Sequence, residues 1–183
     1  MCHNSMMSHV ETTRDGSLVL TCSAWSRPLS ALWDTQGMMD MKYVCTPQVQ
    51  LPFSMAYSYG KSLCGFRHGF EDSYMEFSKL QQDKLIGTHD NTATLYDVTT
   101  GQTVLTLKDE NRSNNYLWNR ATLNSSDDLA LNDGVLWDVN SGKIVHKFDK
   151  FNANVSGVFH PNDLEIIINS EVVRICMTRH HSS

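Results

Sequence analysis

The chain has 183 residues, of which 40% are hydrophobic and 19% charged, and its formal net charge is -5 at pH 7. This composition is that of a globular protein with a sizeable core. The acidic balance argues against nucleic acid as a partner, because that partner usually requires a basic face. No apolar run approaches the ~20 residues that a membrane-spanning helix needs. We therefore expect neither nucleic acid nor a membrane among the partners.

The first residues, MCHNSMMSHV, lack the basic start and the apolar segment of a secretory signal. We expect residues 1–7 to be disordered. The five cysteines are scattered along the chain, and no two of them form a Cys-x-x-Cys pair. This distribution favours reduced thiols over disulfides. Together these features predict an intracellular protein, nuclear or cytosolic.

The stretch from Leu131 to Phe148 predicts two short strands joined by a tight turn. Apolar residues alternate through Val135, Trp137 and Val139, which is the period of a strand. Asn140-Ser141-Gly142 has the composition of a hairpin turn. A Trp-Asp pair at the end of one strand, then a polar turn and a second strand, is typical of a WD repeat, whose propeller blade has four strands.

The same pattern recurs along the chain. A first unit reaches Trp33-Asp34 and a second reaches Tyr96-Asp97, before the third at Trp137-Asp138. The interval from Asp97 to Asp138 falls within the ~40–45 residues of a WD blade, whereas the interval from Asp34 to Asp97 is longer. The surplus lies in residues 44–69, which follow neither the strand nor the helix period.

The sequence therefore predicts an all-β fold, an incomplete WD40-type β-propeller of about three and a half four-stranded blades. The fourth strand of the first blade is expected at residues 39–44, and the strand pattern is expected to stop after the apolar run that ends at Asn169. The predicted ranges are a disordered N-terminus (1–7), a blade (8–43), a loop or disordered insert (44–69), two blades (70–110 and 111–149), a partial blade (150–171) and a non-matching tail (172–183).

Five segments carry a resemblance to a known family: SHVETTRDGSLVLT, LSALW, EFSKLQQDKLIGT, DDLALNDGVLWDV and HKFDKFNANVSGVFHPNDLEIIIN. Over residues 8–43 and 70–171 the chain resembles the WD-repeat domain of the Vpr-binding protein family, the substrate receptors of cullin-4 RING ubiquitin ligases. The resemblance implies a non-catalytic adaptor without a cofactor, located in the nucleus and also the cytoplasm. It implies two kinds of partner, protein substrates and the ligase's damaged-DNA-binding adaptor subunit.

The resemblance also implies a partner-binding motif. In this family the arginine of a Trp-Asp-x-Arg sequence meets the adaptor subunit, a role that suits the planar fork of a guanidinium. The corresponding residues here are Trp137, Asp138 and Asn140. Asn140 lacks the reach and the charge of arginine, which counts against adaptor docking by this chain. Trp137 and Asp138 also have a purely structural interpretation, in which the indole fills space between blades and the carboxylate ties strand to turn.

Two tracts depart from the family, the insert at residues 44–69 and the tail at 172–183. Each tract begins with valine, whose codons start with the letters that open an intron, so translated intron sequence is one hypothesis for both. Three other interpretations stay open: a generic WD-repeat scaffold without ligase coupling, a non-functional truncated variant and, least favoured, a propeller enzyme. For the last, the sequence nominates no catalytic residue, because no acid, base or metal-ligating set converges.

Overall fold

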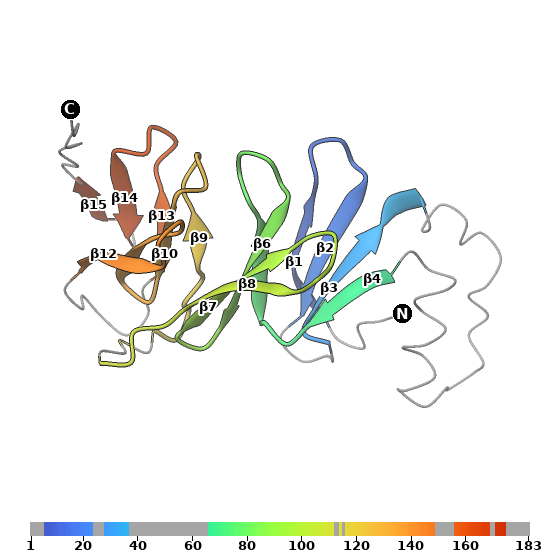
Figure 1. Cartoon of the computed structure of the whole chain (residues 1–183), viewed down its shortest axis with the longest axis horizontal. Coiled ribbons are helices and arrows are strands. Elements are labelled where there is room, and N and C mark those ends of the chain that lie inside the picture. Colours follow the sequence, from blue (N-terminus) through green and yellow to red (C-terminus); the bar gives the residue numbers. More distant parts are fainter. Residues whose placement is uncertain are drawn as a thin grey trace.

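The computed structural model describes residues 6–23, 28–36, 66–111, 114, 116–148, 156–168 and 171–174. The described part folds into fifteen β-strands, which form four antiparallel sheets. Figure 1 shows the sheets side by side along the longest axis, in chain order. They do not close into a ring within the described part of the chain.

In each sheet, strands that are consecutive in the sequence are neighbours in space. The first sheet contains β1 (Met7–Thr12), β2 (Leu18–Ser23), β3 (Ser30–Asp34) and β4 (Phe66–Phe70). The second contains β5 (Tyr74–Phe77), β6 (Lys84–His89), β7 (Thr92–Asp97) and β8 (Thr103–Leu107). The third contains β9 (Thr122–Leu123), β10 (Leu129–Asn132), β11 (Val135–Asp138) and β12 (Lys143–Lys147). The fourth contains β13 (Gly157–Phe159), β14 (Glu165–Ile168) and β15 (Glu171–Arg174). These meanders are the arrangement of propeller blades, which confirms the prediction of an all-β fold with WD40-like blades.

The fourth strand of the first sheet lies later in the chain than the sequence predicts. β4 pairs with β3, with Ala31 opposite Gly69, so the strand begins inside the range that we assigned to the insert. Phe70 is buried between the first two sheets, and this burial selects β4 for the edge of β3. Gly69 and the charged Arg67 hide the strand from a sequence pattern. The expected strand at 39–44, and the rest of the insert, lie outside the described residues.

The strand pattern also continues beyond the point where the sequence predicts its end. β15 pairs with β14, and Val173 lies opposite Ile166. The β-branched pair Val172-Val173 suits an extended backbone, and β14 offers an edge of N–H and C=O groups that require partners. The first residues of the predicted tail are therefore part of the fourth sheet.

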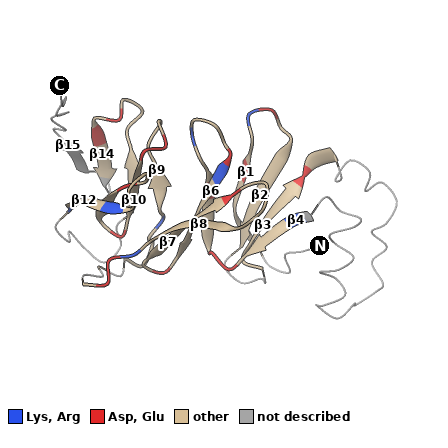
Figure 2. Cartoon of the chain, in the orientation of Figure 1, with Lys and Arg blue, Asp and Glu red and all other residues tan. Residues whose placement is uncertain are grey.

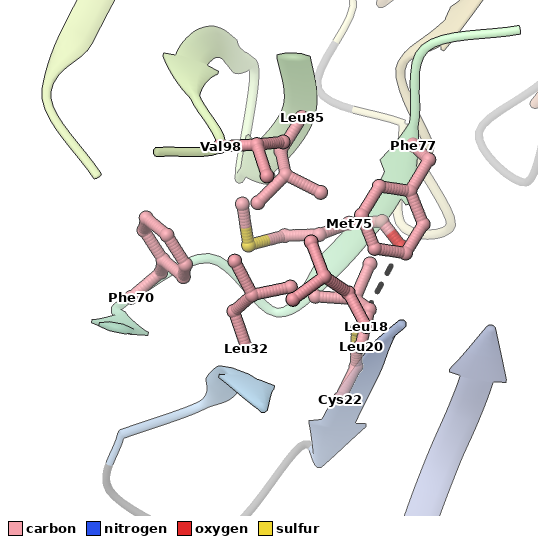
Figure 3. Close-up of a cluster of buried hydrophobic side chains, with 9 residues drawn as sticks. All are labelled: Leu18, Leu20, Cys22, Leu32, Phe70, Met75, Phe77, Leu85 and Val98. Atoms are coloured by element: carbon pink, nitrogen blue, oxygen red, sulfur yellow. Dashed lines mark hydrogen bonds between the residues drawn. The ribbon is translucent and has the colours of Figure 1, made fainter. Parts of the chain in front are cut away.

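The hydrophobic cores lie between the sheets. Figure 3 shows the first of them, where Leu20 and Leu32 of the first sheet meet Met75, Phe77 and Leu85 of the second. A second core joins the second and third sheets, and a third joins the third and fourth. At ~1.5–3 kcal/mol for each large side chain that is fully buried, these interfaces stabilise the fold, and each sheet depends on its neighbours for burial.

A repeated contact links the turns that follow the first strand of each sheet. Each turn holds one residue with a positive φ angle, which is Gly16, Gln82, Asp127 or Asp163. The last three accept a hydrogen bond from a backbone N–H in the turn of the preceding sheet. The pairs are Arg14 to Gln82 at 2.8 Å, Lys79 to Asp127 at 2.6 Å and Ser125 to Asp163 at 3.1 Å. We call these contacts the turn latches.

A second repeated contact links the first strands of successive sheets. The carboxylate of Glu11 in β1 accepts a hydrogen bond from Phe77 N of β5 at 3.1 Å. The carboxylate of Glu76 in β5 accepts one from Leu123 N of β9 at 3.3 Å and one from the Thr122 hydroxyl at 2.6 Å. Acidic side chains thus satisfy N–H groups that the edge of a sheet would otherwise leave without a partner.

Candidate partner-binding hairpin

The three residues of the predicted motif lie on one hairpin but point to different environments. Trp137 is in β11, only 5% exposed, and packs in the core between the second and third sheets. Asp138 is the last residue of β11 and is partly exposed, and Asn140 is exposed in the turn before β12. A partner that approaches the hairpin therefore meets Asn140 and the turn around it, while the indole stays inside.

Asp138 holds the turn together. Its Oδ1 accepts hydrogen bonds from Ser141 N at 2.7 Å and from the Ser141 hydroxyl at 2.9 Å. Its carbonyl oxygen accepts one from Gly142 N at 2.9 Å. The bond from the Ser141 backbone, and then the bond from its hydroxyl, lower the pKa of Asp138 below its ordinary value. These contacts stabilise the carboxylate form and bend the chain into β12.

The second sheet repeats this hairpin. Asp97 Oδ1 accepts hydrogen bonds from Thr100 N at 2.7 Å and from the Thr100 hydroxyl at 2.9 Å. Its carbonyl accepts one from Gly101 N at 2.8 Å, and its pKa is lowered, first by the Thr100 backbone bond. Thr99 occupies the position of Asn140. Because the geometry recurs where no arginine motif exists, the aspartate has a structural role in both hairpins.

The aromatic position of the second sheet carries a tyrosine with a specific polar contact. The Tyr96 hydroxyl donates a hydrogen bond to Asp72 Oδ2 at 2.7 Å. Asp72 is buried, and desolvation raises its pKa, an effect that the bond from Tyr96 opposes. In the first sheet, Trp33 Nε1 instead donates to the Thr21 hydroxyl at 2.8 Å. The indole and the phenol thus serve the same position with different partners.

Arg67 is a residue of this region that the sequence did not single out. Its Nη2 lies 2.9 Å from Asp34 Oδ2, and both side chains are partly exposed. Asp34 is the first-sheet counterpart of Asp97 and Asp138. In the first sheet, therefore, a guanidinium lies beside the aspartate that ends the third strand. Its binding to Asp34 occupies part of the fork that would contact a partner. No sequence signal indicates the pair, because Arg67 lies on β4, far from Asp34 in the chain.

Leu117 and Trp118 were also missed, and the structure places them on the surface. The available signal was an apolar pair inside the polar run from Asn111 to Arg120. Elsewhere in the described residues, no group of three or more His, Cys, Asp or Glu is placed to hold a metal ion. Nor does any helix in the described part of the chain have the length and hydropathy of a membrane span.

No protein-family model matches the chain. Protein mahjong of Drosophila melanogaster is 43% identical over 171 residues, which are 93% of this chain and 10% of that protein. DDB1- and CUL4-associated factor homolog 1 of Caenorhabditis elegans is 33% identical over 184 residues, 98% of this chain and 9% of that protein. The Arabidopsis thaliana protein of the same name is 41% identical over 81 residues, 43% of this chain and 4% of that protein.

This chain is a homologue of DDB1- and CUL4-associated factor homolog 1. The predicted relationship to the Vpr-binding protein family is thereby confirmed. The chain spans about a tenth of the length of the curated relatives that cover most of it. The homology therefore concerns one segment of proteins that are far longer.

Proposed function

We propose that this chain acts in the substrate-receptor domain of a cullin-4 RING ubiquitin ligase, where it holds proteins for ubiquitination without catalysing the transfer. Its homology, over nearly the whole chain, to proteins named for association with DDB1 and CUL4 carries the proposal. The antiparallel sheets support it, because they present turns at both ends as a binding surface. Nuclear residence, with a cytoplasmic fraction, belongs to the same proposal, and microscopy of the tagged chain tests it.

The partner within the ligase is the damaged-DNA-binding adaptor subunit, and the hairpin tip at Asn140 is the surface proposed to face it. Asparagine offers one short amide where a guanidinium would form paired hydrogen bonds. Adaptor binding through this tip is therefore weak, and arginine at the same position strengthens it. Trp137 and Asp138 contribute by shaping the hairpin from within.

Binding of the purified chain to the purified adaptor subunit tests the proposal. We expect measurable binding that Asn140→Arg strengthens about tenfold, the gain typical of a good charged contact. Thr99→Arg is the matched control, because it adds the same charge at the same turn position of the second sheet. Equal gains from both variants would indicate general electrostatic attraction, and no binding by any variant would overturn adaptor docking.

Asn140 stands where the Trp-Asp-x-Arg motif has its arginine. This difference favours a second candidate, a WD-repeat scaffold without ligase coupling. In that case the adaptor subunit binds neither the native chain nor Asn140→Arg, while protein ligands still bind at the opposite end of the sheets. Binding of the adaptor subunit to the native chain and to Asn140→Arg separates the two candidates.

A further inference from the structure

The connection between β8 and β9 displays two large apolar side chains to solvent. Leu117 is 74% exposed and Trp118 is 64% exposed. Neighbouring exposed residues of this size are unusual on a protein surface and mark contact sites. Tryptophan is moreover among the residues that contribute most to protein interfaces. We call this pair the Leu-Trp tip.

The tip is held in place by its own turn and by the turn between β10 and β11. Asn119 N donates to Tyr116 O at 3.1 Å, which closes a turn around Leu117 and Trp118. The buried carboxylate of Asp133 accepts hydrogen bonds from Asn114 N at 2.7 Å and from Tyr116 N at 3.1 Å. The Tyr116 side chain is itself buried in the core between the third and fourth sheets.

Asn119 anchors the other side of the tip. Its Nδ2 donates to Asp90 O and to Asn132 Oδ1, both at 2.8 Å. Its Oδ1 accepts a hydrogen bond from Asp133 N at 3.0 Å. The apolar pair is therefore preorganised, and a partner does not have to order the loop on binding, which lowers the entropic cost of association.

The charge around the tip indicates what binds there. Asp90, whose backbone contacts Asn119, has a side chain 88% exposed. Glu110 on the same β8–β9 connection is also exposed and pairs with Lys108 at 3.4 Å, and Figure 2 shows red segments there. Arg120, which follows the tip in the chain, is directed elsewhere, with its guanidinium carbon 4.9 Å from the centre of the Tyr74 ring. An apolar tip beside the exposed carboxylate of Asp90, on a chain of charge -5, complements a segment that is apolar and basic.

The topology places this tip away from the hairpin of Asn140. In a meander, successive connections alternate between the two ends of the sheet. The turn at Asn140 joins β11 to β12, so it lies at the end opposite the β10–β11 turn that anchors the tip. In Figure 1 the β8–β9 connection runs along the lower edge, while the turns after β5 and β13 lie at the upper edge. The two ends can therefore engage different partners at once.

We propose that the Leu-Trp tip binds an amphipathic segment of a substrate protein, with apolar side chains flanked by lysine or arginine. The proposal rests on the function proposed above and identifies the chemistry of the substrate. Leu117 and Trp118 cover the apolar side of the segment. Asp90 pairs with its basic flank.

Selection from a displayed random-peptide library on the purified chain tests the proposal. We expect the enriched peptides to combine apolar with basic residues and to lose about tenfold or more in affinity for Trp118→Ser, the loss typical of an interface hot spot. Asp90→Asn should weaken the same peptides and make their binding less dependent on salt. Val104→Ser is the matched control, because Val104 is an exposed apolar residue of β8 outside the tip.

Three results would overturn the proposal. The first is a selection that enriches no peptides, or whose peptides bind the native chain and Trp118→Ser equally. The second is a selection that enriches acidic peptides. The third is a blue shift of tryptophan fluorescence with phosphatidylserine vesicles that Trp118→Ser abolishes, which would assign the tip to a lipid surface. Adaptor binding by Trp118→Ser, measured in parallel, should equal that of the native chain. If the native chain fails to bind the adaptor subunit while the peptide results hold, the proposed function is contradicted and the proposal for the Leu-Trp tip stands.

Discussion

The carboxylate of Asp127 in the third sheet accepts a hydrogen bond from Lys79 N in the second sheet at 2.6 Å, and a further bond from Leu80 N at 2.8 Å. The residue occupies the left-handed region, with φ at 59°. The same relationship recurs one sheet earlier through Gln82 and one sheet later through Asp163. The turn latches thus align each sheet with its predecessor at one end, while the apolar cores hold them together at the centre.

Asp127→Ala should destabilise the chain by ~1–3 kcal/mol, because two backbone N–H groups lose a charged acceptor. Urea denaturation measures the change in the free energy of unfolding. Asp90→Ala is the matched control, since Asp90 is also left-handed, with φ at 52°, yet its carboxylate is exposed and, among the described residues, lies near His89. Equal losses in the two variants would show that backbone strain, not the latch, accounts for the effect.

Acid should weaken the two hairpins together. Asp97 and Asp138 each have a pKa below the ordinary 3.8. Each therefore contributes stability that is complete above the unfolded value and is lost as the pH falls through the folded value. Removing the side-chain donor with Ser141→Ala should move the pKa of Asp138 part of the way back, because the stronger contribution, the backbone bond, remains. Carboxyl chemical shifts during an NMR titration measure this, and an unchanged Asp138 curve would contradict the prediction.

Asp72 should produce a pH dependence of the opposite sign. Burial raises its pKa, so the folded state binds the proton more tightly than the unfolded state, and this residue adds stability as the pH falls through the folded pKa. Tyr96→Phe removes a hydrogen bond that opposes this rise in the pKa of Asp72. The gain in stability should therefore begin at a higher pH in that variant. Asp72→Asn should abolish this gain in stability, both in the native chain and in the Tyr96→Phe variant. Unfolding curves measured over a pH series check this. If the gain in stability at low pH survives in Asp72→Asn, another group is responsible for it.

Gly101→Ala should cost more stability than Gly16→Ala. Both glycines are left-handed, with φ at 69° and 70°, so alanine introduces similar backbone strain of ~1 kcal/mol. A Cβ on Gly101 would lie 2.6 Å from the ring of His68, whereas a Cβ on Gly16 meets nothing within 4 Å. Thermal unfolding of the two variants measures the difference, which His68→Ala should abolish if the clash is its cause.

The strands and turns that rest on neighbouring residues could be predicted before the structure. The alternation around Trp137 and the turn at Asn140–Gly142 correspond to β11, β12 and the connection between them. The structural interpretation of Asp138 agrees with its hydrogen bonds to Ser141. Period-two alternation and turn composition are local properties, and a short window of sequence contains them in full.

Only the tertiary structure decided the choice of β4 as the partner of β3, the turn latches and the exposure of the Leu-Trp tip. Arg67 and Asp34, or Asp127 and Lys79, meet because sheets and edges bring distant residues together, and no window of sequence contains both members of such a pair. The exposure of Trp118 likewise depends on which neighbours fill the space around it. An apolar residue in the sequence is compatible with a core or with a surface, and packing alone separates the two.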